Sequence, residues 1–228
     1  MEYVSPLRVW VVIAAYNEGR VIDRVVADVA RCGCSIVVVD DCSSDRTSAV
    51  AWQADAVIRH PVNLGQGAAL QTGIDYALAR DTDIIVTFDG DGQHRAADIA
   101  SLVQALEEAQ ADFALGSRFL GCSIGLPLSR ALLLKAAILF TRLTTGLRLS
   151  DTHNGLRAMT RRGAGMIRLR QNRMAHASEI LAQIAASGLR YVEVPVSIEY
   201  NDYSLAKGQR LSDALIILLD LFARRLYR

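Results

Sequence analysis

The sequence of 228 residues has no apolar run long enough to cross a bilayer, which takes about 20 consecutive apolar residues. It also lacks an excess of charge of either sign, because 25 Lys and Arg residues nearly cancel 24 Asp and Glu residues. A balanced charge creates no overall field that attracts a polyanion. We therefore expect no nucleic acid as a partner, and any anionic ligand must be held by local groups.

Cysteine is scarce, and the four residues present lack the paired Cys/His spacing of a structural zinc site. The N-terminus enters a strand-like segment, where a signal peptide would need a cationic start and an apolar run. These absences predict a reduced, cytoplasmic setting.

The chain is rich in apolar residues, which make up 51% of it. This content is enough to bury the core of one good-sized domain, and neither a linker nor an internal repeat divides the sequence. We expect one domain over residues 1–228.

Short β-branched runs alternate with longer helical patterns in the first half of the chain. Such fully apolar runs between helices are typical of a parallel sheet that is covered on both faces. The pattern predicts an α/β fold with a mostly parallel sheet flanked by helices. The expected strands are Val9–Ala14, Ile36–Asp40, Ala56–Arg59, Ile84–Asp89, Phe113–Gly116 and Tyr191–Ile198, and the expected helices are Glu18–Arg31, Asp45–Ala54, Gln66–Ala79, Ala96–Ala109 and Ala175–Ser187.

The strongest chemical signal is a pair of carboxylates, Asp89 and Asp91, at the end of an apolar strand. Ligands of parallel sheets gather at the carboxyl ends of the strands. Mg²⁺ and Mn²⁺ prefer oxygen ligands and usually join one or two carboxylates to substrate phosphates. We expect such an ion on Asp91 and Asp89, with the Gln93 amide oxygen as a third ligand. The alternative is a simple turn, since Asp and Gly both favour turns.

Five motifs in consistent order resemble glycosyltransferase family 2, whose members have the GT-A fold. The resemblance is to the branch of dolichol-phosphate mannosyltransferases and polyprenyl-phosphate glycosyltransferases. It covers roughly residues 8 to 200. The matching stretches are Val12–Glu18, Val38–Thr47, Asn63–Gly67, Phe88–His94 and Gly116–Phe119.

The resemblance implies a GDP- or UDP-linked sugar as the donor. Asp41 would accept a hydrogen bond from the nucleobase, and Tyr16 and Glu18 would form the rest of the base and ribose pocket. Gly67 permits close backbone approach to a ligand at a helix start, and Lys207 belongs to a segment that resembles a loop over the donor phosphates. The chain departs from the family at two positions, with Gln66 where lysine is common and Ala14 where proline is common.

The acceptor determines the subclass of the enzyme. A hydroxyl acceptor needs a general base, whereas a phosphate is already ionised and needs fixed positive charge, for which arginine is well suited. The resemblance assigns Arg118 and Arg130 to a lipid phosphate, with Ser129 at the start of the same helix and Asp151 on the acceptor side. Glu179 is the candidate base if the acceptor is a hydroxyl, or else it orients Arg118 or a sugar hydroxyl.

Two apolar segments with basic residues, at about 127–147 and 211–227, resemble helices that lie in a bilayer interface. A core helix looks similar, so the pattern also fits intra-domain packing, a homo-oligomer or a membrane-protein partner. We expect peripheral attachment to the inner face of the membrane.

Together these features predict an inverting, metal-dependent transfer of a hexose from a nucleotide-sugar to a polyprenyl phosphate, for cell-envelope glycan assembly. Two alternatives stay open: a family 2 transferase acting on a sugar hydroxyl, and a non-catalytic subunit that binds nucleotide-sugars.

Overall fold

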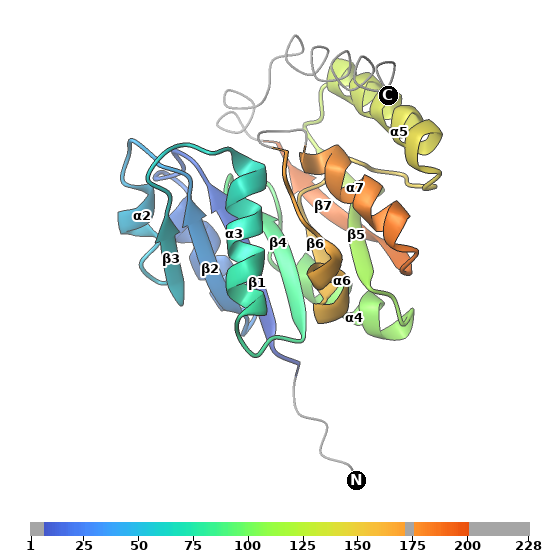
Figure 1. Ribbon diagram of the computed structural model, residues 1–228. Helices are drawn as coiled ribbons and strands as arrows, with labels where there is room; N and C mark the ends of the chain where they lie inside the picture. The colour runs from blue at the N-terminus through green and yellow to red at the C-terminus, as the bar shows by residue number, and fades with distance from the viewer. Residues whose placement is uncertain (1–6, 172–175, 201–228) are drawn as a thin grey trace.

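Seven strands form one mixed sheet in the computed structural model, which describes residues 7–171 and 176–200 (Figure 1). Their order across the sheet is β3-β2-β1-β4-β6-β5-β7, and β6 alone runs antiparallel to both of its neighbours among these strands. The strands are β1 (Val9–Ala15), β2 (Ser35–Asp40), β3 (Ala56–Arg59), β4 (Ile84–Asp89), β5 (Phe113–Ile124), β6 (Arg157–Thr160) and β7 (Tyr191–Glu199).

Helices cover both faces of this sheet, as Figure 1 shows. The core on one face joins the sheet to α1 (Ile22–Ala30) and α4 (Asp98–Glu108). The core on the other face joins it to α3 (Gln66–Leu78), α6 (Arg161–Met166) and α7 (His176–Ser187). The remaining helices are the short α2 (Thr47–Val50) and α5 (Leu128–Thr145), which packs beside α7.

Alternation along β1 explains why the sheet is buried on both sides. Val11 and Ile13 point into the core under α1 and α4, and Val12 points into the core under α3. All three side chains are 0% exposed, and burying each such side chain contributes about 1.5–3 kcal/mol. In α1, apolar residues recur with helical spacing at positions 22, 25, 26 and 29, so one stripe of this helix is buried against the sheet.

The sequence therefore predicts the mostly parallel sheet and its flanking helices correctly. Two elements were not expected, β6 and α6, and β5 continues eight residues beyond its expected end at Gly116 to Ile124. The extension exists because β5 resumes pairing with β7 after an irregularity between Ser117 and Cys122. Helix α2 is shorter than the expected 45–54.

Within the described ranges, no helix combines the length and apolarity that crossing a membrane requires. Helix α5 corresponds to the segment expected at about 127–147. The segment expected at 211–227 and Lys207 lie outside the described residues.

Candidate active site

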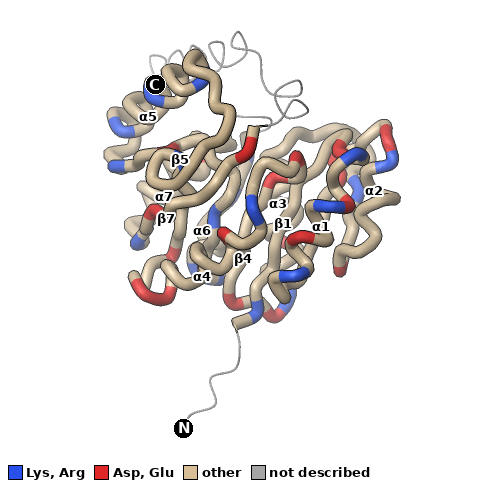
Figure 2. The backbone as a smooth tube through the Cα atoms, turned by 180° about the vertical axis from the view of Figure 1, so that it is seen from behind, with Lys and Arg blue, Asp and Glu red and all other residues tan. Residues whose placement is uncertain are grey.

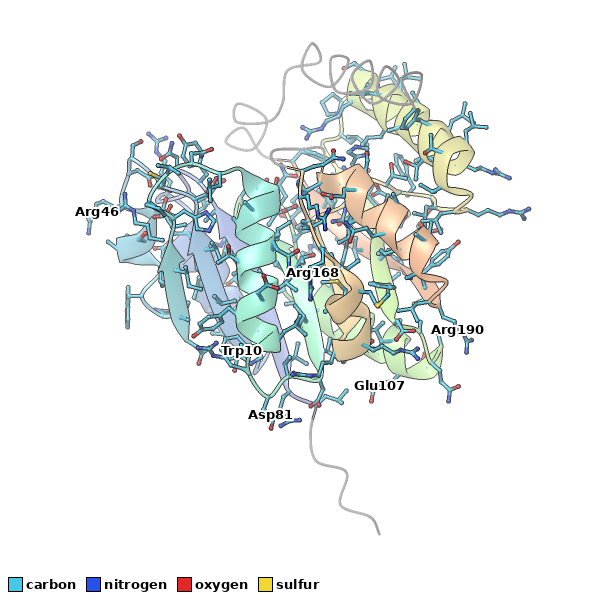
Figure 3. All side chains as sticks on the ribbon, viewed as in Figure 1. Trp10, Arg46, Asp81, Glu107, Arg168 and Arg190 are labelled. Carbon is cyan, nitrogen blue, oxygen red and sulfur yellow. The ribbon has the colours of Figure 1, made fainter. Side chains whose placement is uncertain are left out.

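A cleft of about 440 Å³ opens where β1, β2 and β4 end. The first residue of β6 also lines it, because this strand runs in the opposite direction and so begins at the edge where the others end. In Figure 3 the labelled Arg46 lies toward this edge, whereas Trp10 and Asp81 lie at the opposite one. The cleft is thus at the edge where a parallel sheet is expected to bind its ligand.

Asp89 is the last residue of β4 and is held in place by two side chains. Its Oδ1 accepts a hydrogen bond from Gln66 Nε2 at 3.0 Å, and its Oδ2 contacts His94 Nε2 at 3.0 Å. Burial alone would raise the pKa of the Asp89 carboxyl, but the hydrogen bond and charge of His94, together with Arg157, lower it below its usual value. Asp89 is therefore an anchored carboxylate that stays ionised.

Asp91 lies two residues further on and lines the same cleft. Burial and the negative charge of Asp89 raise the pKa of Asp91 to about 6. Its Oδ1 accepts the backbone N–H of Gln93 at 3.0 Å, and Oδ2 has no hydrogen bond to the described residues. Two crowded, partly desolvated carboxylates are a fitting site for a divalent cation, which would relieve their repulsion.

No group of three or more His, Cys, Asp or Glu side chains in the described part of the chain is arranged to hold a metal by itself. This arrangement is compatible with Mg²⁺ or Mn²⁺, because these ions usually take only one or two carboxylates and complete their shell with water and phosphate oxygens. The Gln93 side chain, expected as a third ligand, also lines the cleft.

Asp41 lines the cleft beyond the end of β2. Its carboxylate accepts the backbone N–H groups of Leu64 at 2.9 Å and Gly65 at 2.6 Å, and contacts His60 Nδ1 at 2.8 Å. An ionised carboxylate has about four acceptor positions, so one position remains for a ligand. Tyr16, which is 45% exposed, and the buried Glu18 line the cleft beside it.

Arg118 on β5 also lines the cleft and is 5% exposed, and β6 separates this strand from β4, which carries Asp89. Its guanidinium donates to Asp151 Oδ2 from Nε at 2.6 Å, to the Tyr200 hydroxyl from Nη1, and to the carbonyl of His153 from Nη2. Asp151 and Tyr200 more than offset the effect of burial, so the pKa of Arg118 is raised. Three of the five N–H groups of Arg118 are thus used inside the protein.

Arg130 lies in the first turn of α5 and lines the cleft. Its guanidinium carbon lies 5.1 Å from the centre of the Tyr200 ring, a cation–π distance. Tyr200 therefore contacts both arginines, one through its hydroxyl and one through its ring. Tyr200 could not be predicted from the sequence, because a tyrosine at the end of a strand carries no signal of its own.

Arg157 and Asn154 are two further cleft residues, and the sequence predicted no role for either. Each is 3% exposed. Burial lowers the pKa of Arg157, although the nearby Asp89 and Asp151 act in the opposite direction. The backbone between Asn154 and Arg157 can approach Asp89 because residue 155 is glycine. An added Cβ at Gly155 would lie 2.0 Å from Asp89 Oδ2.

Four of the expected site residues within the described ranges are not among the cleft-lining residues. Asp151 lies beneath Arg118, and Ser129 is exposed on α5. Gly67 packs against the chain ahead of α7, since an added Cβ would lie 2.3 Å from the Gln171 carbonyl oxygen. The Glu179 carboxylate accepts the backbone N–H groups of Arg170 and Gln171 at 2.8–3.1 Å.

Comparison with known families identifies the chain. Residues 10–165 match the model of glycosyl transferase family 2, which is more than half of the sequence and contains both Asp89 and Asp91. The chain belongs to glycosyltransferase family 2. This membership makes the protein a glycosyltransferase, as the motifs predict.

Two relatives place this glycosyltransferase in the branch predicted from the sequence. It is 30% identical to the UDP-N-acetylglucosamine–dolichyl-phosphate N-acetylglucosaminyltransferase of Methanococcus voltae, over 88% of this chain and 89% of that protein. It is also 30% identical to the polyprenol monophosphomannose synthase of Mycolicibacterium smegmatis, over 91% of this chain and 84% of that protein. The two relatives are named for different sugars.

A solved structure confirms the GT-A fold of this glycosyltransferase. The glucosyl-3-phosphoglycerate synthase of Mycobacterium tuberculosis, crystallised with Mn²⁺ and UDP-glucose, superposes with a TM-score of 0.73. The match covers 97% of this chain and 78% of that one, at 18% sequence identity.

Proposed function

We propose that this glycosyltransferase transfers a hexose from a nucleotide-sugar to the phosphate of a polyprenyl phosphate, with a divalent cation and with inversion at the anomeric carbon. The observation that carries the proposal is one cleft lined both by Asp89 and Asp91 at the end of β4 and by Arg118 and Arg130. Strand β6 lies between β4 and β5, so it separates Asp89 from Arg118. A cation-bound diphosphate fits the acidic side, and a second phosphate fits the basic side.

The donor side rests on Asp91 and its neighbours. Asp91, Asp89 and Gln93 would hold Mg²⁺ or Mn²⁺, and the bound ion would neutralise the diphosphate that leaves with the nucleotide. Asp89 is held by Gln66 and His94, so its carboxylate is positioned before a ligand binds. Similar structures contain Mn²⁺ together with UDP or UDP-glucose, which supports this reading of the acidic side.

The acceptor side rests on fixed positive charge. Tyr200 positions Arg118 and Arg130 next to each other, and a phosphate can accept hydrogen bonds from both guanidinium groups. A phosphate monoester needs no base to become a nucleophile. Glu179, the base required by the hydroxyl-acceptor alternative, is bound to two backbone N–H groups and does not line the cleft, which favours the phosphate acceptor.

The residues on the two sides suggest a single displacement. Arg118 and Arg130 hold the attacking phosphate oxygen on the side of the sugar away from the leaving diphosphate. Charge thus leaves from one phosphate and arrives from another, and preplaced charges at both ends stabilise the transition state without reorganisation. One displacement inverts the configuration of the anomeric carbon.

Helix α5 suits attachment to a membrane surface. Four leucines on it are 59–78% exposed, and they recur with helical spacing at positions 128, 132, 139 and 143. Lys135 and Arg142 are exposed and, by helical spacing, lie on the same side as these leucines. The helix has no acidic residue, and Figure 2 shows basic but no acidic positions along α5. An apolar face with basic residues is typical of interfacial helices, and each basic residue near anionic lipid contributes about 1 kcal/mol.

The proposed function is tested with labelled UDP-N-acetylglucosamine, UDP-glucose and GDP-mannose, Mn²⁺ or Mg²⁺, and two acceptors, undecaprenyl phosphate and undecaprenol. We expect label on undecaprenyl phosphate alone. Arg130→Gln is expected to raise the acceptor KM, whereas Arg190→Gln is the control, because this exposed arginine lies away from the cleft (Figure 3). Transfer to undecaprenol, or to neither acceptor, would refute the proposal.

Membrane attachment is tested separately by flotation with anionic liposomes. Leu139→Glu is expected to reduce binding, because it puts a negative charge in the exposed leucine face of α5. Unchanged binding of this variant, or no binding of the unaltered protein with and without polyprenyl phosphate, would remove the membrane role.

A further inference from the structure

Two buried side-chain nitrogens that line the cleft have no hydrogen-bond partner among the residues that the structure describes. They are Nη1 of Arg157 and Nδ2 of Asn154, and both side chains line the cleft. Native proteins pair most buried polar groups, so two unpaired donors beside one cleft indicate that a ligand supplies the acceptors. A third unpaired atom, Nδ1 of His94, belongs to the side chain that holds Asp89.

The strand register places Arg157 between the two sides of the cleft. Arg157 pairs with Thr87 on β4 and with Leu115 on β5. Asp89 ends the first of these strands, and Arg118 follows on the second. A sugar that moves from a diphosphate at Asp91 to a phosphate at Arg118 must pass the end of β6, which lies between these strands. Arg157 is the residue at that end.

The surroundings of Arg157 favour hydroxyl groups over another phosphate as its ligand. Its charge is already opposed by Asp89 and Asp151, and both carboxylates would repel a phosphate placed there. A hydroxyl accepts from one neighbour and donates to another. The N–H donors of Arg157 and Asn154 line the same cleft as the carboxylate of Asp89, which matches this requirement.

The Asn154 side chain is held so that only its N–H groups are left for a ligand. Its Oδ1 accepts the backbone N–H of Leu156 at 3.0 Å, which fixes the orientation of the amide. Arg118 differs in this respect, because three of its N–H groups are already bound inside the protein.

We propose that Arg157 and Asn154 form the subsite that binds the hydroxyl oxygens of the transferred hexose, and so determine which sugar is accepted. The inference rests on the proposed function and deepens it. It makes Arg157 and Asn154 specificity-determining residues, distinct from the arginines that hold the acceptor phosphate.

The test combines variants with donors that lack one hydroxyl. The intact nucleotide-sugar that the protein accepts is compared with its 2-, 3-, 4- and 6-deoxy forms, by Kd from calorimetry with Mn²⁺ and by kcat/KM. For at least one position, removal of the hydroxyl is expected to cost the unaltered protein roughly 10- to 100-fold, which is the range of a hydrogen bond to a charged group. In Arg157→Gln, the shorter side chain cannot reach the position of Nη1. Removal of the same hydroxyl from the donor is therefore expected to leave the Kd and kcat/KM of this variant almost unchanged.

Asn154→Asp is the second variant, because it keeps the oxygen that binds Leu156 N and removes the free N–H. Both variants are expected to bind UDP or GDP alone as the unaltered protein does, and Arg190→Gln is again the control. Equal deoxy penalties in variant and unaltered protein overturn the inference, as does weaker binding of the diphosphate alone or no binding of any nucleotide-sugar. If lipid is glycosylated but the deoxy donors affect variant and unaltered protein equally, only the sugar-subsite inference is refuted. If the variants reduce the effect of a missing hydroxyl on donor binding but no lipid is glycosylated, only the proposed acceptor is refuted.

Discussion

Arg118 and Asp151 form a buried ion pair, and the loss of one of its charges is expected to lower the free energy of unfolding by a measurable amount. Their side chains are 5% and 0% exposed, and Nε lies 2.6 Å from Oδ2. Removing one partner of a buried pair costs about 3–5 kcal/mol, because the other charge remains uncompensated. Asp151→Asn keeps one oxygen that can still accept an N–H, so we expect the lower value, about 3 kcal/mol. For a protein of this size, that corresponds to roughly 6–12 °C in Tm.

The assay is urea unfolding followed by circular dichroism, together with calorimetric melting. Glu199→Gln is the matched control: Arg95 Nη2 lies 2.6 Å from Glu199 Oε1, the same distance, but the side chains are 50% and 49% exposed. Exposed pairs contribute little, so this variant is expected to unfold like the unaltered protein. If Asp151→Asn and Glu199→Gln are equally stable, the buried ion pair of Arg118 contributes no more to the free energy of unfolding than the exposed one, which contradicts the prediction.

Three further predictions follow from buried or bound groups. Burial lowers the pKa of His153 to about 4, whereas the pKa of a histidine in the unfolded chain is about 6.5. Below pH 6.5 the unfolded chain therefore binds one more proton than the folded protein. As a result, the free energy of unfolding is expected to fall by about 2–3 kcal/mol by pH 4.5. Urea titrations at pH 7.5 and 4.5 are expected to show a smaller loss in His153→Gln, and an equal loss would contradict the reasoning. Glu179→Gln is expected to lower Tm by a few degrees, since its carboxylate binds two backbone N–H groups, and to keep kcat within a few-fold; lost turnover at unchanged Tm would instead support a role as base. Tyr200→Phe is expected to raise the acceptor KM several-fold with the donor KM unchanged, because its hydroxyl contacts Arg118 and its ring lies under Arg130; equal changes in both constants would argue against this positioning role.

The fold could be predicted where a strand is recognisable from its amino-acid composition. Val9–Ala14 and Ile84–Asp89 are apolar runs rich in β-branched residues, and both are strands in the structure at nearly these bounds. Arg157–Thr160 has a single β-branched residue, so its strand character comes from pairing with both β4 and β5 and is not visible locally.

The site could be predicted where a motif ends a strand. Asp41, Asp89, Asp91 and Arg118 were found in this way, and all of them line one cleft. Their roles in binding and catalysis stay predictions.

Contacts between distant segments could not be predicted from the sequence. Tyr200 lies 82 residues from Arg118, and the partners of Glu179 precede it by eight or nine residues on a loop. The unpaired N–H of Arg157 becomes visible only when its surroundings are known, since an arginine in a sequence is by default a solvated surface residue.

The most direct test of the account is calorimetric titration of UDP and GDP with and without Mn²⁺, in the unaltered protein, Asp91→Asn and Arg130→Gln. The account predicts that the unaltered protein and Arg130→Gln bind one of the diphosphates only when Mn²⁺ is present, and that Asp91→Asn binds neither with measurable affinity. Binding that is independent of Mn²⁺, or that survives in Asp91→Asn, would contradict the claim that the acidic end of β4 holds the donor through a cation.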